Sequence, residues 1–273
     1  MKSANLLRIL APGSFAWCSV FSEDCLKGNP TFVIRLSSWG DVRQLAAVAQ
    51  CLGNHETTFF TLNDGILQIR WFAADKEVPL CGHGALAVAS ILESVLNDGN
   101  ALPVLNHENK LWLLKQSGNP FIVLRRPLLI QISTEQFRVG APVVEAFDVG
   151  RDYLLILKDE ESLRRFRPIP GALESLDKIG CILSAPSSSG TAAFRFFAPR
   201  AGITEDRASG SVIPSLVEYW KQKGRAAPYT FYQESGYSIR IKAEENDRGI
   251  AVGGDVIILG VGGLASSIWS ART

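Results

Sequence analysis

Two segments of the chain combine ionisable side chains with glycines in a pattern that could bind a small anion. The first runs from Cys81 to Gly84 and includes His83, and the second runs from Asp206 to Ser211. Each precedes an apolar stretch typical of a helix, and the first N–H groups of a helix lack intrahelical partners and carry partial positive charge. Glycine lets a ligand approach such a backbone closely. Both segments therefore predict a helix start that binds a carboxylate.

These segments belong to a longer internal sequence repeat. Arg70–Ala73 resembles Arg195–Ala198, and each of these runs is predicted to be a strand that enters a loop. The loops contain Glu77–His83 and Glu205–Ser211, and each then enters an apolar helix. Two copies of a strand, a loop and a helix predict two similar halves that face each other. Chance similarity of two such units is the alternative.

Hydrophobic periodicity predicts the helices that position these segments. An apolar helix is expected over 82–96, and another over about 210–223. An earlier helix is expected just after Ser38, because Ser38 and Asp41 form a pattern like a capping box.

Strands are predicted through most of the remaining chain. Strand-like runs at 56–62 and 66–72 flank Asn63–Gly65, which is a strong hairpin signal. Glu56 therefore stands at the beginning of a strand. The second half is interpreted mainly as short strands, with one polar helix near 159–167.

Composition describes a globular chain of balanced charge. The 273 residues are 47% hydrophobic, and 28 Lys and Arg oppose 27 Asp and Glu, which gives a formal net charge of +1. This balance provides no general field for nucleic acid, so no nucleic-acid partner is expected. No apolar run reaches ~18 residues, so no membrane span is expected.

Cysteine and histidine spacing excludes two further classes of site. The five cysteines form no C-x-x-C pair, which predicts free thiols in a reducing, cytoplasmic setting rather than disulfides. The three histidines show no metal-ligand spacing, so no metal site is expected.

Taken in order, the motifs resemble the phenazine-biosynthesis PhzF-like family. The matching positions are 20–22, 28–30, 55–59, 70–72, 77–83, 205–206, 210–211, 233 and 252–254. The resemblance implies a diaminopimelate epimerase-like α+β fold of two similar halves, each a curved, mostly antiparallel, barrel-like sheet around a central helix. We expect the halves to span 1–125 and 126–273, with the alternative that the last strand returns to the first half.

The resemblance also implies an activity. It indicates a cofactor-independent isomerase that moves a proton on a small carboxylate substrate in the cleft between the halves, and that forms a homodimer as members often do. The residues to which it assigns catalysis are Glu56, His83 and Asp206. The residues expected to bind substrate are Gly82, Gly84, Gly210 and Ser211. A carboxylate can take a proton and return it when burial raises its pKa toward neutrality.

Departures from the family pattern define the alternatives. Arg207 replaces a proline, and His55 stands where serine is usual. Ser209 occupies the position where related epimerases carry a second cysteine, and a hydroxyl is too weak an acid to replace a thiol directly. An amino- or hydroxy-acid epimerase or racemase is therefore the runner-up, and Cys81 is interpreted as a buried small residue. A non-catalytic ligand-binding protein is the remaining alternative.

Overall fold

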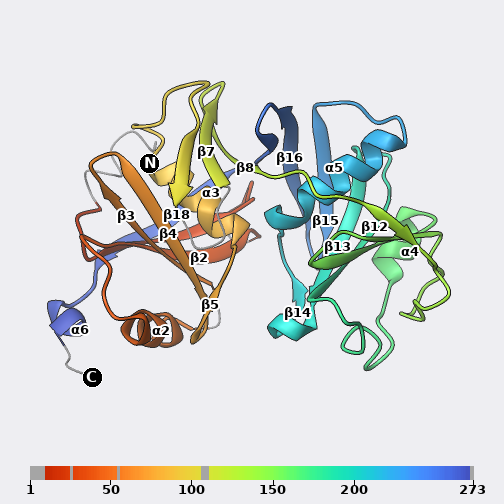
Figure 1. Cartoon of the computed structure of the whole chain (residues 1–273), viewed down its shortest axis with the longest axis horizontal. Coiled ribbons are helices and arrows are strands. Elements are labelled where there is room, and N and C mark those ends of the chain that lie inside the picture. The colour runs from red at the N-terminus through yellow and green to blue at the C-terminus, as the bar shows by residue number, and fades with distance from the viewer. Residues whose placement is uncertain (1–9, 25–26, 54–55, 106–110, 271–273) are drawn as a thin grey trace. The chain divides into compact units, whose positions relative to one another are not determined.

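The computed structural model describes residues 10–24, 27–53, 56–105 and 111–270, and it divides into two compact units. Unit 1 comprises 1–124 together with 253–273, and unit 2 comprises 125–252. Each unit consists of curved, mostly antiparallel strands with a few helices (Figure 1). The expected α+β class is confirmed.

The sheet of unit 1 joins the last strand of the chain to the first. Its strands are β1 (Ser14–Val20), β2 (Asn29–Arg35), β3 (Thr57–Asn63), β4 (Ile66–Ala73), β5 (Lys76–Val78), β6 (Leu102–Leu105), β7 (Leu111–Gln116), β8 (Asn119–Leu124) and β18 (Val256–Gly263). Strand β1 pairs antiparallel with both β18 and β2. The parallel pairs are β2 with β3 and β4 with β6. The helices among its described residues are α2 (Val42–Cys51), α3 (Gly82–Ile91) and α6 (Ser266–Ser270).

Unit 2 repeats this mixture of strands and short helices. Its strands are β9 (Ile130–Ile132), β10 (Glu145–Asp148), β11 (Asp152–Ile156), β12 (Gly180–Pro186), β13 (Ala192–Ala198), β14 (Ile203–Asp206), β15 (Tyr229–Glu234), β16 (Ser238–Asn246) and β17 (Gly249–Gly253). Its helical segments are α4 (Glu160–Arg165), η2 (Pro199–Ala201), η3 (Gly210–Val212) and α5 (Ile213–Gln222). Strand β13 pairs antiparallel with β12 and parallel with β15.

The predicted hairpin is confirmed, whereas two helix boundaries were wrong. Asp64 and Gly65 both have positive φ, as the two central residues of a type I′ turn require. Helix α2 begins after Asp41, whose carboxylate accepts the N–H of Arg43, so Asp41 and not Ser38 is the cap. Helix α3 ends at Ile91, and the chain then turns with Leu92 and Leu96 buried and Val95 exposed.

Helices α3 and α5 differ in how much of their surface is buried. All ten residues of α3 are buried, as expected for a helix that is apolar around its whole circumference. Helix α5 buries seven of its ten residues, and only Lys221 and Gln222 at its end are exposed. Among the described residues, no helix is both long and apolar enough to cross a membrane.

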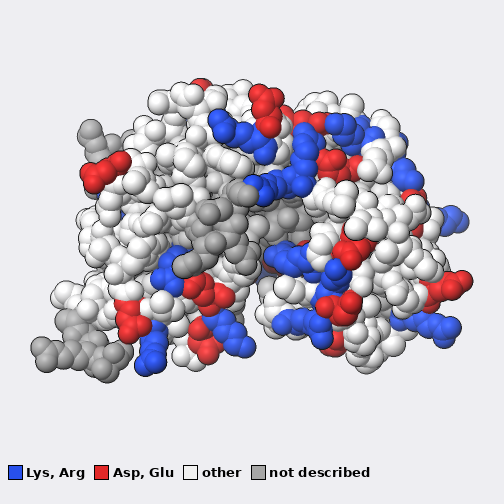
Figure 2. Space-filling model, in the orientation of Figure 1, with Lys and Arg blue, Asp and Glu red and all other residues white. Residues whose placement is uncertain are grey.

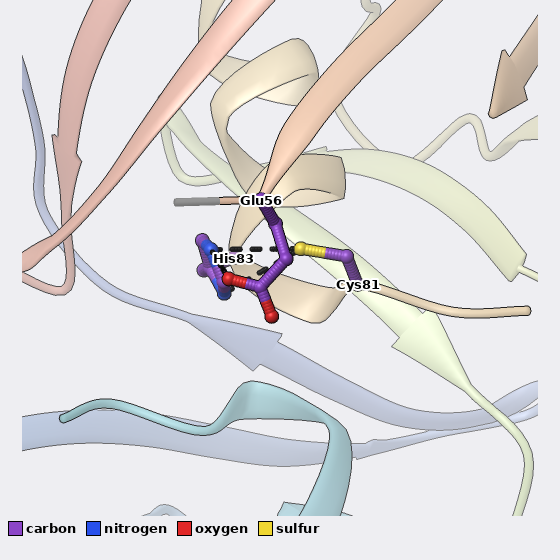
Figure 3. Close-up of side chains that lie close together, drawn as sticks. All are labelled: Glu56, Cys81 and His83. Carbon is purple, nitrogen blue, oxygen red and sulfur yellow. Dashed lines mark hydrogen bonds and ion pairs between the residues drawn. The ribbon is translucent and has the colours of Figure 1, made fainter. Parts of the chain in front are cut away.

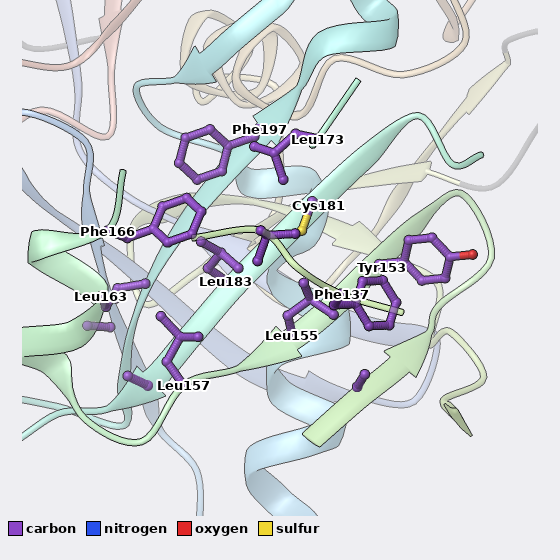
Figure 4. Packing of buried hydrophobic residues seen from close by; sticks show 14 residues of the cluster. Phe137, Tyr153, Leu155, Leu157, Leu163, Phe166, Leu173, Cys181, Leu183 and Phe197 are labelled. Carbon is purple, nitrogen blue, oxygen red and sulfur yellow. The ribbon is translucent and has the colours of Figure 1, made fainter. Parts of the chain in front are cut away.

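A hydrophobic cluster fills unit 2 around β11, β12 and β13 (Figure 4). Leu155, Leu183 and Phe197 are almost completely buried there, and Phe166 contacts Phe197 edge to face. Cys181 belongs to the same cluster, and burial raises the pKa of its thiol far above the usual range. The neutral thiol therefore packs as a small apolar group.

The two copies of the internal sequence repeat make matching side-chain contacts. Arg70 donates two hydrogen bonds to Glu77, at 2.7 and 2.5 Å, and Arg195 donates two to Glu205, both at 2.7 Å. Each guanidinium also lies over the phenylalanine two residues further along the strand. The same bidentate pair therefore joins β4 to β5 in unit 1 and β13 to β14 in unit 2.

Charges of both signs are mixed on the molecular surface. On the face drawn in Figure 2, Lys and Arg lie among Asp and Glu rather than in a separate field. Several exposed pairs contribute to this mixture, among them Arg165 with Glu161 at 2.8 Å.

Tyr229 is expected to make unit 2 sensitive to alkaline pH. Its buried hydroxyl donates to Glu245 at 3.0 Å, and burial together with this bond raises the pKa of Tyr229 to about 12. Unfolded tyrosine ionises near pH 10, so this contribution to stability is complete below about pH 10 and is lost between about pH 10 and 12. Urea unfolding of Tyr229→Phe should therefore show a shallower alkaline decline. The exposed Tyr237→Phe is the control, and equal slopes for Tyr229→Phe and wild type would contradict the assignment.

Candidate functional site

Glu56, Cys81 and His83 meet at the start of helix α3 (Figure 3). The Oε2 atom of Glu56 lies 3.5 Å from Nε2 of His83. The Sγ atom of Cys81 lies 3.5 Å from each ring nitrogen of the same histidine. His83 and Cys81 are buried, whereas the Glu56 side chain keeps 23% of its surface exposed. A carboxylate that reaches solvent therefore contacts an imidazole held inside the unit.

Local backbone structure explains how these three groups come together. Cys81 is the N-cap of α3, with extended φ and ψ, and its sulfur accepts the N–H of Gly84 at 3.3 Å. His83 follows in the first helical turn. Glu56 precedes β3, and its carbonyl accepts a 2.7 Å hydrogen bond from the hydroxyl of Thr31 on β2. The thiol is therefore more than the small packing residue that the sequence suggested.

Asn29 orients the imidazole from the opposite side. Its Nδ2 atom lies 3.4 Å from Nδ1 of His83. An amide N–H that donates to Nδ1 leaves the ring proton on Nε2, the nitrogen that faces Glu56. This tautomer gives the Glu56 carboxylate a hydrogen-bond donor.

The glycine at 84 has a packing explanation. A Cβ there would overlap the hydroxyl of Thr58 and would crowd Cys81 and Trp71. Its N–H already pairs with Cys81. The substrate-binding role expected of Gly84 therefore stays a prediction, as does that of Gly82, which is buried in the same turn.

Unit 2 contains a second polar cluster, formed by Asp206, Ser209 and Gln233. The Ser209 hydroxyl donates to the Asp206 carboxylate at 2.5 Å. The Gln233 amide oxygen accepts the Ser209 N–H, and its nitrogen donates to the Asp206 carbonyl, both at 2.6 Å. Gln233 is completely buried and Ser209 nearly so. The amide therefore fixes the turn that presents the Asp206 carboxylate.

The helix predicted over 210–223 begins irregularly. Gly210 and Ser211 lie in the 3₁₀ turn η3, and α5 follows from Ile213. Ser209 precedes this turn with extended backbone angles close to those of Cys81, although its side chain does not cap the turn. Arg207 is exposed next to Asp206. His55 and His107 lie outside the described residues.

Sequence reasoning gave no site role to Asn29 or Gln233, although both stand at positions of the family resemblance. The available signal was an amide side chain within or next to a strand-like apolar run. A buried amide must find hydrogen-bond partners, so it often fixes a neighbouring polar group.

A carboxylate, an imidazole and a thiol at one buried helix start form a site equipped to transfer protons. The chain belongs to the phenazine biosynthesis-like protein family (PhzC-PhzF), whose model matches residues 18–122 and 124–257.

Individual relatives agree with this membership. An uncharacterised isomerase of Pseudomonas aeruginosa is 29% identical over 257 residues, which cover 91% of this chain and 97% of the relative. An uncharacterised isomerase of Vibrio cholerae is 31% identical over 210 residues, which cover 75% and 74%. The crystal structure of a PhzF-family protein from Enterococcus faecalis superimposes with a TM-score of 0.81 at 28% identity, covering 92% of this chain and 98% of that one. The expected fold is therefore confirmed.

Proposed function

We propose that this protein is an isomerase that moves a proton between carbon atoms of a small carboxylate substrate, with Glu56 as the general acid and base. The observation that carries the proposal is the contact between the Glu56 carboxylate and Nε2 of the buried, oriented His83. Similarity to curated relatives named as isomerases supports the reaction class.

The chemistry follows from these residues. Glu56 removes a proton from one carbon of the substrate and returns it to another, so the reaction is redox-neutral and its protons balance. The Nε2–H of His83 donates to the carboxylate and holds it in one position, which favours transfer along a fixed path. In the same proposal, Asp206 acts on the substrate too, and the helix starts at Gly82, Gly84, Gly210 and Ser211 bind its carboxylate.

The cluster in unit 2 favours an isomerase over a two-thiol epimerase. A two-thiol mechanism needs an acidic group at the position of Ser209. Here the Ser209 hydroxyl donates to the Asp206 carboxylate and is anchored by Gln233. Ser209 therefore suits a positioning role. A cytoplasmic homodimer remains the expected state, and light scattering of the purified protein tests the dimer.

Proton NMR in D₂O tests the proposal directly. The panel contains dihydro-hydroxyanthranilate, diaminopimelate, hydroxyproline and the common amino acids. We expect one compound to lose a carbon-bound proton signal in the presence of the protein, and its product spectrum to show a shifted double bond. Inversion at one carbon would instead identify an epimerase. A compound that binds without any exchange would favour the non-catalytic alternative.

A further inference from the structure

The groups gathered around His83 are also the ligands that zinc prefers. Zinc sites in proteins use thiolate sulfur, imidazole nitrogen and carboxylate oxygen. Cys81, His83 and Glu56 offer one of each, and the three ligand atoms lie within 4.8 Å of one another. No metal site was expected from the sequence because only the spacing of ligands along the chain was considered. That spacing does not show that residue 56 lies beside 81 and 83.

We propose that Glu56, Cys81 and His83 form a Zn²⁺ site at which the bound ion inhibits the protein. The inhibition rests on the proposed function, because zinc would occupy the carboxylate that moves the proton. The binding itself depends only on the three side chains.

Two of the three distances between ligand atoms suit tetrahedral coordination, and the third, between the Glu56 oxygen and the Cys81 sulfur, is within 4.8 Å. Zinc lies about 2.3 Å from sulfur and about 2.0–2.2 Å from nitrogen or oxygen, which puts neighbouring ligand atoms roughly 3.3–3.6 Å apart. The Glu56 oxygen and the Cys81 sulfur are each 3.5 Å from Nε2 of His83. The sulfur is equally far from Nδ1, so rotation of the ring is needed to aim the Nε2 lone pair at the ion.

Charge and protons also balance at this site. Zinc displaces the proton of the Cys81 thiol to solvent, and the thiolate with the Glu56 carboxylate neutralises the two charges of the ion. His83 must then carry its proton on Nδ1. A half-turn of the Asn29 amide presents its oxygen to Nδ1, which is the outer-shell contact that metal-binding histidines usually make.

Burial gives the site one open side. Cys81 and His83 are each 4% exposed, while the Glu56 side chain reaches solvent. Three protein ligands leave a fourth position for water, as in zinc sites that exchange ligands. The thiol and the imidazole favour zinc over Mg²⁺ or Ca²⁺, which take oxygen ligands.

Titration with Co²⁺ and Zn²⁺ tests the site without measuring turnover. The background protein carries Cys25→Ser and Cys51→Ser, because Cys51 is exposed and Cys25 lies outside the described residues. We expect one Co²⁺ per chain, a thiolate-to-cobalt charge-transfer band, and displacement by Zn²⁺. Cys81→Ser should abolish the band and weaken binding by more than the roughly 10–100-fold that loss of an outer-shell partner costs. Asn29→Leu should weaken binding within that range and keep the band.

The outcomes separate this inference from the proposed function. A band that persists in Cys81→Ser, or background protein without stoichiometric binding at micromolar metal, would overturn the zinc site. If the exchange reaction is found, Zn²⁺ should suppress it and EDTA should restore it. Stoichiometric zinc binding through Cys81 in a protein that exchanges no proton with any tested compound would keep the zinc site and favour the non-catalytic alternative to the isomerase.

Discussion

Replacing Glu56 with glutamine should reduce proton exchange into substrate by about 10²–10⁴-fold, the usual contribution of a positioned acid or base. The amide keeps the shape of the side chain and can still accept a hydrogen bond from Nε2 of His83. It cannot take a proton from carbon and return it. Substrate binding and thermal stability should therefore remain close to wild type. The measurement is the rate of deuterium incorporation by NMR, alongside a binding isotherm and a melting curve.

A matched glutamate provides the control for this substitution. Glu161 lies exposed on α4, where it pairs with Arg165. Glu161→Gln makes the same chemical change at an exposed position to which no role in the reaction is assigned, so exchange should stay at the wild-type rate. If Glu56→Gln exchanged protons at the wild-type rate, Glu56 would not be the base of the reaction. Loss of exchange together with loss of folded protein would show that the Glu56 variant reports on structure instead.

The parts of the fold set by local chemistry could be predicted. Asn63–Gly65 indicated a hairpin because Asp64 and Gly65 tolerate positive φ, and both adopt it. The sequence repeat that contains Arg70 and Arg195 likewise corresponds to the same arginine–glutamate pair in both units. The end of α3 could not be predicted, because Leu92 and Leu96 are buried beyond Ile91 and continue the apolar pattern of the helix.

The candidate site was predictable where chemistry lies in neighbouring residues. Cys81 and His83 are two residues apart, so a helix start brings them together. The sequence assigned Glu56 to the site only through the family resemblance. No local pattern shows that the residue before β3 lies beside the start of α3, because this contact is tertiary. The roles of Asn29 and Gln233 were missed because each depends on long-range contacts that no local pattern encodes.

Replacing Gln233 with leucine should destabilise the protein by about 1–3 kcal/mol. The substitution removes the partner of the buried Ser209 N–H, and a buried unsatisfied group costs about 1–3 kcal/mol. It also removes the donor to the partly buried Asp206 carbonyl. Leucine has a similar volume, so a cavity adds little. Urea unfolding measures the loss of stability, and Gln222→Leu at the end of α5 is the matched control on an exposed surface.

Gln233→Glu tests the two hydrogen bonds of the Gln233 side chain separately. The carboxylate can still accept the Ser209 N–H, but it has no donor for the Asp206 carbonyl, and its charge opposes that of the Asp206 carboxylate. If Gln233 serves to present Asp206, this variant should lose exchange activity more than it loses stability. Equal losses of both would reduce Gln233 to a structural residue. Full activity in a folded Gln233→Glu protein would mean that the geometry of Asp206 does not matter for the reaction.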